Sequence, residues 1–144
     1  MQWTDEYSVG IEEIDNQHKE LLRLFSVVEN AIAADQGWSS VHYAILEIKH
    51  FVEFHFEFEE AVMRMYDFPD YEQHCLGHSV FVGKMSAIVG KSLKGDNQEK
   101  LVAFFFDWLL NHIKMADRDY AQHILAGAKL KSSVKSSAED RLAA

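Results

Sequence analysis

The sequence predicts an all-α protein in which four helices form an up-down-up-down bundle. The chain of 144 residues contains only one proline and seven glycines, so it has few of the turn-forming residues that an all-β fold needs. Four segments of roughly 20 residues carry apolar side chains at the spacing of one helix face. Three short connections separate these segments, and short connections favour antiparallel neighbours in a bundle.

The first predicted helix covers residues 15–34, and the second runs from about Ser39 or Ser40 to Tyr66. Asp15 is the expected N-cap of the first helix, because its short side chain accepts hydrogen bonds from free backbone N–H groups. Residues 35–37, Asp-Gln-Gly, are expected to end that helix. The faces expected to be buried are Ile14, His18, Leu21, Phe25, Val28 and Ile32 in the first helix, and Ile48, Phe51, Val52, His55, Glu59 and Val62 in the second.

The third predicted helix spans residues 71–93, and the fourth begins near Gln98. Pro69 breaks the preceding helix, and Asp70 with Gln73 has the spacing of a capping box at the start of the third. Residues 94–97, Lys-Gly-Asp-Asn, predict a turn before the fourth helix. The expected buried faces are His74, His78, Phe81, Met85 and Ile88 in the third helix, and Leu101, Phe105, Trp108, Leu109 and His112 in the fourth.

Two segments lie outside the predicted bundle. Residues 1–13 contain Trp3 and Tyr7, and we expect them to form an ordered arm packed on the helices. Residues 129–144 are small and polar, as is typical of a loosely attached tail. The sequence therefore predicts one domain over residues 1–128, followed by a C-terminal tail.

The overall composition restricts the partners and the compartment. The formal net charge of −9 argues against binding to nucleic acids or to anionic membrane surfaces, because both attract basic proteins. The single cysteine, Cys75, cannot form an internal disulfide. The N-terminal residues show no basic region followed by an apolar stretch, so we find no signal peptide and expect a cytoplasmic protein.

Histidines and a glutamate lie within the apolar faces of the predicted helices. Residues four apart share one side of a helix. A single buried histidine is usually a satisfied core residue, but six such groups without partners would cost a few kcal/mol each. The pattern therefore predicts a metal centre in the bundle core. Its residues are His18 in the first helix, His55 and Glu59 in the second, His74 and His78 in the third, and His112 in the fourth.

Imidazoles and carboxylates with little sulfur suit iron or another first-row metal ion. Zinc usually takes four ligands, which makes so large a ligand set awkward for zinc. A ferritin-like di-iron site needs two Glu-x-x-His motifs, and the one such motif, Glu47–His50, lies on the wrong face. Cys75 points about 100° away from His74 around the helix and is expected to be a small buried residue. The histidines expected to be surface or structural residues are His42, His50 and His123.

Four segments together carry a family resemblance: Gly10-Ile11-Glu12-Glu13-Ile14-Asp15-Asn16-Gln17-His18, His55-x3-Glu59, His74-x3-His78 and His112-Ile113-x3-Asp117. In order and spacing they resemble the bacterial hemerythrin family, over about residues 1–125. The resemblance implies two iron ions per chain, joined by a bridging oxo or hydroxo group. It assigns His74, His78 and His112 to one iron, His18 and His55 to the other, and Glu59 and Asp117 to both as bridges.

The resemblance also implies reversible dioxygen binding at the iron that keeps an open position, for oxygen storage, delivery or scavenging, without enzymatic activity. It assigns the lining of the oxygen pocket to Leu21, Phe56, Trp108, Leu109 and Ile113. None of these side chains has an acidic proton, whereas an oxidase or peroxidase needs a proton donor near the metal. Two alternatives stay open: a domain that senses oxygen, nitric oxide or redox state for a separate partner protein, and a di-iron peroxidase-like enzyme.

The fourth helix is expected to be irregular between His112 and Asp117. Residues five apart differ in direction by about 140° in a regular α-helix. The two side chains therefore cannot reach the same metal centre from an unbroken helix. Either the helix ends soon after His112, or a π-bulge or 3₁₀ turn interrupts it, and both interruptions are frequent at functional sites.

Overall fold

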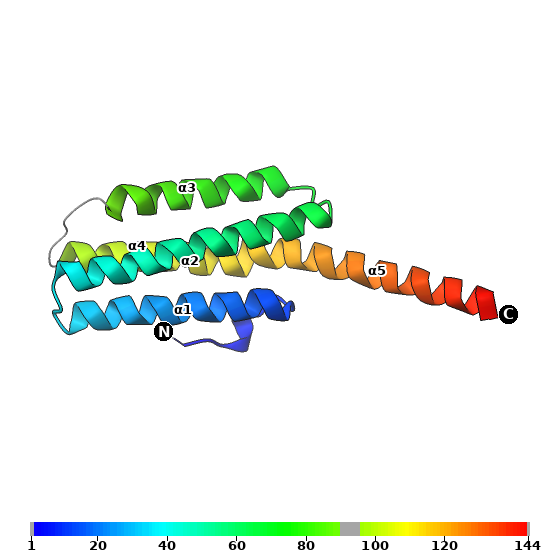
Figure 1. The fold of residues 1–144 in the computed structure, drawn as a ribbon, viewed down its shortest axis with the longest axis horizontal. Coiled ribbons are helices and arrows are strands. Elements are labelled where there is room, and N and C mark those ends of the chain that lie inside the picture. Colours follow the sequence, from blue (N-terminus) through cyan, green and yellow to red (C-terminus); the bar gives the residue numbers. More distant parts are fainter. Residues whose placement is uncertain (1, 90–95, 144) are drawn as a thin grey trace.

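The computed structural model describes residues 2–89 and 96–143, and every regular element within those ranges is helical. The prediction of an all-α four-helix bundle is confirmed. Figure 1 shows the long helices lying side by side, with the C-terminal helix continuing beyond the others. The elements are η1 (Asp5–Tyr7), α1 (Glu12–Ala33), α2 (Trp38–Met65), α3 (Tyr71–Val89), α4 (Asp96–His112), the π-helical turn η2 (Ile113–Asp117) and α5 (Arg118–Ala143).

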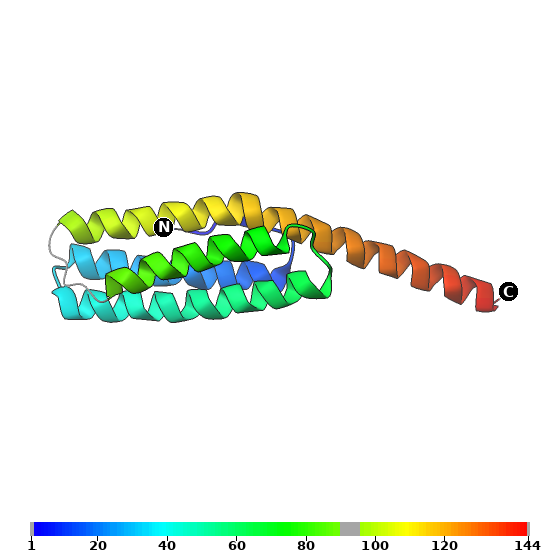
Figure 2. The same cartoon turned by 90° about the horizontal axis from the view of Figure 1, so that it is seen from above.

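The helices pack in the order that short connections predict. Helix α2 packs against both α1 and α3, and α1 also packs against α4. The fourth position of the bundle is filled by α4, η2 and the first part of α5, which form one continuous rod in both views (Figures 1 and 2). Each long helix therefore presents one side to a shared core.

The N-terminal arm is ordered, as predicted, but it changes the start of the first helix. Helix α1 begins at Glu12 with Ile11 as N-cap and no side-chain cap, so the prediction that Asp15 is the N-cap is wrong. The Asp15 carboxylate instead accepts hydrogen bonds from the Ser8 hydroxyl at 2.5 Å and the Val9 backbone N–H at 2.8 Å. These hydrogen bonds connect the arm to α1. They occupy the Asp15 carboxylate, which an N-cap would have used to accept hydrogen bonds from the first turn of the helix.

The boundaries around the third connection differ slightly from the prediction. Helix α3 starts at Tyr71, as expected, and is described as far as Val89. The predicted end at residue 93, and Lys94 and Gly95 of the predicted turn, lie outside the described residues. Asp96 and Asn97, predicted to belong to the turn, form the first residues of α4.

Among the described residues, the apolar core consists of two clusters. One occupies the half of the bundle near the α1–α2 connection and includes Leu21, Phe56, Leu109 and Ile113. The other lies near the arm and the α2–α3 connection; its buried members are Val9, Ile14, Met63, Phe68, Tyr120, Ala121 and Ile124. Along each of the four rods, the predicted ligands fall in sequence between residues of one cluster and residues of the other. The polar site is thus enclosed by apolar side chains on both sides.

The segment predicted to be a loosely attached tail is helical. Residues 129–143 continue α5 and project past the end of the bundle (Figure 1). Their side chains are exposed, apart from Lys131, whose side chain is not described. None of the helices in the described ranges is long and apolar enough to cross a membrane.

Removing residues 129–144 should leave the bundle intact. Because the described side chains of this stretch are exposed, we expect the free energy of unfolding to change by no more than about 0.5 kcal/mol. Denaturant unfolding of the full and shortened chains measures this. As a matched control, Ile124→Ala in the buried part of α5 should cost about 2–5 kcal/mol. A loss of that size in the shortened chain would contradict the proposed boundary at residue 128.

Candidate metal centre

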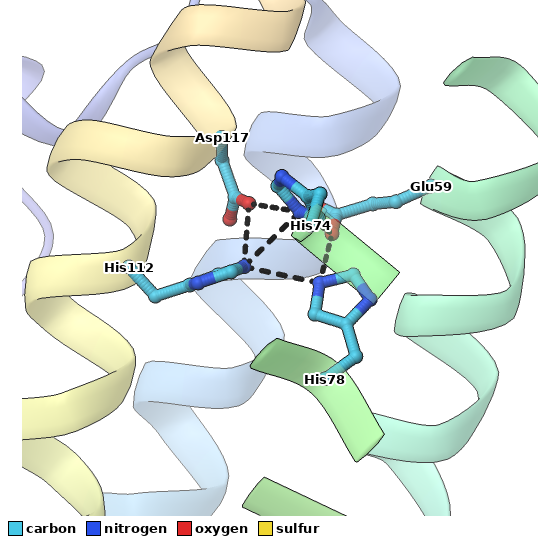
Figure 3. A group of neighbouring side chains, drawn as sticks. All are labelled: Glu59, His74, His78, His112 and Asp117. Atoms are coloured by element: carbon cyan, nitrogen blue, oxygen red, sulfur yellow. Dashed lines mark hydrogen bonds and ion pairs between the residues drawn. The ribbon is translucent and has the colours of Figure 1, made fainter. Parts of the chain in front are cut away.

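The predicted ligands converge in the middle of the bundle. Figure 3 shows five of them, from three of the four rods, pointing toward one another. His18 and His55 complete the set from α1 and α2. The side chains of His18, His55, Glu59 and Asp117 are fully buried, and those of His74, His78 and His112 are 2–8% exposed.

The donor atoms form two groups that share both carboxylates. One group comprises Glu59, His74, His78, His112 and Asp117, and the other comprises His18, His55, Glu59 and Asp117. Within each group the donor atoms lie within 4.8 Å of one another. Two adjacent positions for metal ions are therefore available, with three histidines at one and two at the other.

Each carboxylate directs its two oxygens toward different groups. For Glu59, Oε1 lies 3.0 Å from Nε2 of His55, while Oε2 lies 3.2 Å from Nε2 of His78. For Asp117, Oδ2 lies 3.1 Å from Nε2 of His18, while Oδ1 lies 3.0 Å from Nε2 of His112. This is the arrangement that bridging carboxylates require.

The π-helical turn η2 brings His112 and Asp117 to the same site. The turn spans Ile113–Asp117, which is where the spacing of the two residues predicts an interruption of the helix. Its wider turn needs one more residue than an α-helical turn, so residues five apart come to share a face. The predicted irregularity is confirmed as a π-helical turn; the helix does not end after His112.

The donor set fits metal ions better than it fits hydrogen bonding among its own members. Nε2 of His112 lies 3.0 Å from Nε2 of His78 and 3.2 Å from Nε2 of His74, and one proton at most can lie between two such nitrogens. A metal ion coordinates lone pairs of this kind directly. Several buried atoms have no hydrogen-bond partner within the described chain: both ring nitrogens of His18, Nε2 of His55, Oε2 of Glu59 and both carboxylate oxygens of Asp117.

The histidines and carboxylates of the site shift one another's pKa values so that their charged forms are favoured. Burial by itself lowers the pKa of His18 and of His74, but the adjoining carboxylates of Asp117 and Glu59 outweigh it and raise the pKa of each to about 9. Burial by itself raises the pKa of Glu59, yet the surrounding histidines hold that pKa well below its ordinary value. The pKa of Asp117 is also lowered: burial and Glu59 oppose the shift, and His112 and His18 cause it.

The histidines excluded from the site by sequence lie outside it. His50 is exposed, and His42 is half-buried with its ring against Trp38. The Nε2 of His123 lies 2.8 Å from the carbonyl oxygen of Tyr66, which is a structural contact between α5 and the end of α2. Cys75 is half-buried and is not among the converging donors.

Sequence reasoning missed two side chains that contact histidines of the site. Oε1 of Gln17 lies 2.7 Å from Nδ1 of His55, and Oε1 of Glu60 lies 3.0 Å from Nδ1 of His78. Both oxygens accept a hydrogen bond from Nδ1–H, which leaves the Nε2 lone pair facing the other donors of the site. Each of these residues is adjacent in sequence to a predicted ligand, and that position alone carries no signal of such a contact.

Tyr120 is a third residue that sequence reasoning missed. Its hydroxyl donates a hydrogen bond to Oε1 of Glu59 at 2.6 Å, and its side chain is fully buried. Burial raises its pKa well above the ordinary value, and the negative charges of Glu59 and Asp117 raise it further. The phenol therefore keeps its proton and holds Glu59 in place.

The residues expected to line an oxygen pocket lie beside the converging donors. They belong to the first of the two apolar core clusters: Leu21, Phe56, Leu109 and Ile113 are buried members, and Trp108 packs against them. The Phe56 ring stacks on His78 with centroids 3.7 Å apart, and the Trp108 ring stacks on His112 at 4.7 Å. These two aromatic rings therefore also fix the orientation of imidazoles in the three-histidine group.

Comparisons with known proteins agree with this geometry. The family model of the hemerythrin HHE cation-binding domain matches residues 9–124. Bacteriohemerythrin of Clostridium acetobutylicum is 28% identical over 125 residues, which cover 82% of this chain and 96% of that protein. A hemerythrin-like protein of Naegleria gruberi is 33% identical over 118 residues, covering 82% and 88%. A crystal structure of wild-type hemerythrin has a TM-score of 0.77 at 25% identity, covering 86% of this chain and 97% of that one. The buried cluster is thus a hemerythrin-like di-metal site.

The metal-free protein should be most stable between about pH 4.5 and 6.5. The raised pKa values of His18 and His74 contribute stability that is complete below 6.5 and is lost as the pH rises through 9. The lowered pKa of Glu59 contributes stability that is complete above 4.5 and is lost as the pH falls. Thermal unfolding of the metal-free chain from pH 4 to pH 9.5 measures this.

Bound metal ions should offset the loss of stability that the metal-free protein shows at alkaline pH. Because a histidine must be deprotonated to bind a metal ion, the stabilisation that metal ions confer should grow from pH 6 to pH 8. The same scan with two equivalents of zinc provides the comparison. A metal-free protein whose melting temperature rises from pH 6.5 to pH 9 would contradict the raised histidine pKa values.

Proposed function

We propose that this chain, which belongs to the hemerythrin family, binds dioxygen reversibly at a pair of iron ions held by the buried cluster. The observation that carries the proposal is the unequal division of histidines around two shared carboxylates. His74, His78 and His112 would saturate one ion, whereas His18 and His55 would leave a coordination position free at the other. An ion with an open position beside a saturated one is suited to binding a small ligand.

Iron is the metal that we propose, because a site of imidazoles and carboxylates without thiolates suits iron among the first-row ions. When bound, the two ions would supply the electrons that allow dioxygen to be held and released. The chain's own contribution is to present the seven donors in a fixed geometry. Gln17 and Glu60 orient imidazoles, and Tyr120 orients the Glu59 carboxylate.

The surroundings of the cluster support a binding function rather than a catalytic one. Leu21, Leu109 and Ile113 are at most 1% exposed, so they exclude water from their side of the site. The nearby phenol of Tyr120 donates a hydrogen bond to Glu59, and its raised pKa keeps the proton on the phenol oxygen. An enzyme that reduces dioxygen needs a group that releases a proton, and the proposed pocket residues contain none.

A second candidate function is sensing for a separate protein, and one observation favours it. Residues 129–143 form an exposed helix beyond the bundle, which offers a surface to a partner. The lifetime of the oxygen-bound protein separates the candidates: hours indicate storage or delivery, and seconds indicate a sensor or an enzyme.

Metal analysis combined with optical spectra tests the proposed function directly. The chain, prepared with iron(II) without oxygen, should contain two iron ions and should develop a new absorption band in air. Removing the oxygen under vacuum should reverse that change, because the proposed binding is reversible. A chain that retains one zinc ion and accepts no second metal ion would contradict the proposal.

Replacing Leu109 or Ile113 by a polar residue of similar size should shorten the lifetime of the oxygen-bound protein. Both side chains are 1% exposed, and a polar group there would admit water to a dry site. We expect Leu109→Asn and Ile113→Thr each to lose oxygen irreversibly at least several times faster, as measured by the decay of the optical band. Leu130→Asn, on the exposed end of α5, is the matched control. Decay rates equal to that control would show that these residues do not protect the site.

A further inference from the structure

The two histidine groups differ in the charge of the side chain behind one imidazole. In the two-histidine group, Nδ1 of His55 donates to the neutral amide oxygen of Gln17 at 2.7 Å. In the three-histidine group, Nδ1 of His78 donates to the carboxylate of Glu60 at 3.0 Å. Both contacts fix the same nitrogen toward the cluster, so they differ in charge and not in orientation.

A carboxylate behind an imidazole makes that imidazole a stronger ligand than an amide does. The negative charge draws the Nδ1 proton toward itself, which raises the electron density and basicity of Nε2. Nε2 of His78 lies at the centre of the cluster, 3.0 Å from Nε2 of His112 and 3.2 Å from Oε2 of Glu59. A change of basicity at this atom therefore acts directly on the metal position of the three-histidine group.

Glu60 is placed for this role because it is only partly exposed and contacts an imidazole that is itself packed against an aromatic ring. Its side chain is 26% exposed, whereas His78 is 2% exposed. The Phe56 ring lies parallel to the His78 ring, with 2° between their planes, so the imidazole cannot turn away from the carboxylate. Glu60 lines a cleft between α2 and α3 together with Glu53 and Glu57, and of these three residues only Glu60 forms a described hydrogen bond to a site histidine.

We propose that Glu60 is a positioning residue that increases the difference in affinity between the two metal positions. Its charge strengthens metal binding by the three-histidine group, while the neutral Gln17 leaves the two-histidine group weaker. This inference rests on the proposed function in that it requires two metal ions, but it does not depend on which metal is bound or on dioxygen. The first metal ion therefore binds to the three-histidine group, whose ligands saturate it. The more weakly held ion lies in the two-histidine group and is the one with the free coordination position.

Stepwise titration of the metal-free chain with cobalt(II) tests the proposal. The parent chain should bind two ions with different affinities. Glu60→Gln keeps an acceptor of the same shape and removes the charge, so the tighter affinity should fall by about 10–100-fold while the weaker one stays within about twofold. Glu57→Gln removes a charge from the same cleft without touching a site histidine, and it should change neither affinity. Thermal unfolding of the metal-free variants verifies that each is folded.

A second measurement separates the electronic role from a merely structural one. In the zinc-loaded protein, the NMR signal of the proton on Nδ1 of His78 should lie far downfield, and it should move upfield in Glu60→Gln but not in Glu57→Gln. Unchanged cobalt affinities in Glu60→Gln, or an equal loss at both positions, would overturn this inference and leave the proposed function standing. A parent chain that binds fewer than two cobalt ions would overturn both.

Discussion

The structure depends on a set of buried polar donors that do not satisfy one another. Two carboxylates and five imidazoles meet in a core that is otherwise apolar. Unpartnered, such groups cost a few kcal/mol each, against a net stability of about 5–15 kcal/mol for a whole domain. All four rods of the bundle contribute at least one donor, so the requirement for metal ions also fixes how the rods sit against one another. The residues behind the donors, Gln17, Glu60 and Tyr120, limit the alternatives further by fixing which atom of each ligand faces inward.

The π-helical turn reconciles two demands made on the fourth rod. Every fourth residue is buried from Phe105 through Leu109, Ile113 and Asp117 to Ala121. In a regular α-helix each step of four residues turns by about 40° beyond a full turn, so these five positions would sweep about 160° around the rod. The extra residue in η2 removes about 100° of this drift. The same turn that joins His112 and Asp117 at the site thus keeps both halves of the rod facing the core.

Local patterns in the sequence predict the bundle, its connections and the converging ligands, because helix periodicity and i,i+4 spacing are themselves local. The irregular turn is also predictable, from the spacing of His112 and Asp117 alone.

Contacts between distant elements could not be predicted from the sequence. Asp15 resembles an N-cap, but the arm occupies its carboxylate. Glu60 and Tyr120 acquire their roles from partners on other helices. The small, polar residues after Ala128 resemble a loose tail, yet they continue a helix that is already formed.

The contact between Nε2 of His18 and Oδ2 of Asp117, at 3.1 Å, joins the first and fourth rods and has a consequence for biosynthesis. A ribosome releases the chain from its N-terminus, at about 5–20 residues per second, so His18 exists for seconds before its partner does. Contacts between residues so far apart are formed late in folding. An unfinished chain therefore carries loose histidines without the paired positions of the completed site. The full pair of metal positions therefore exists only in chains whose translation has passed Asp117.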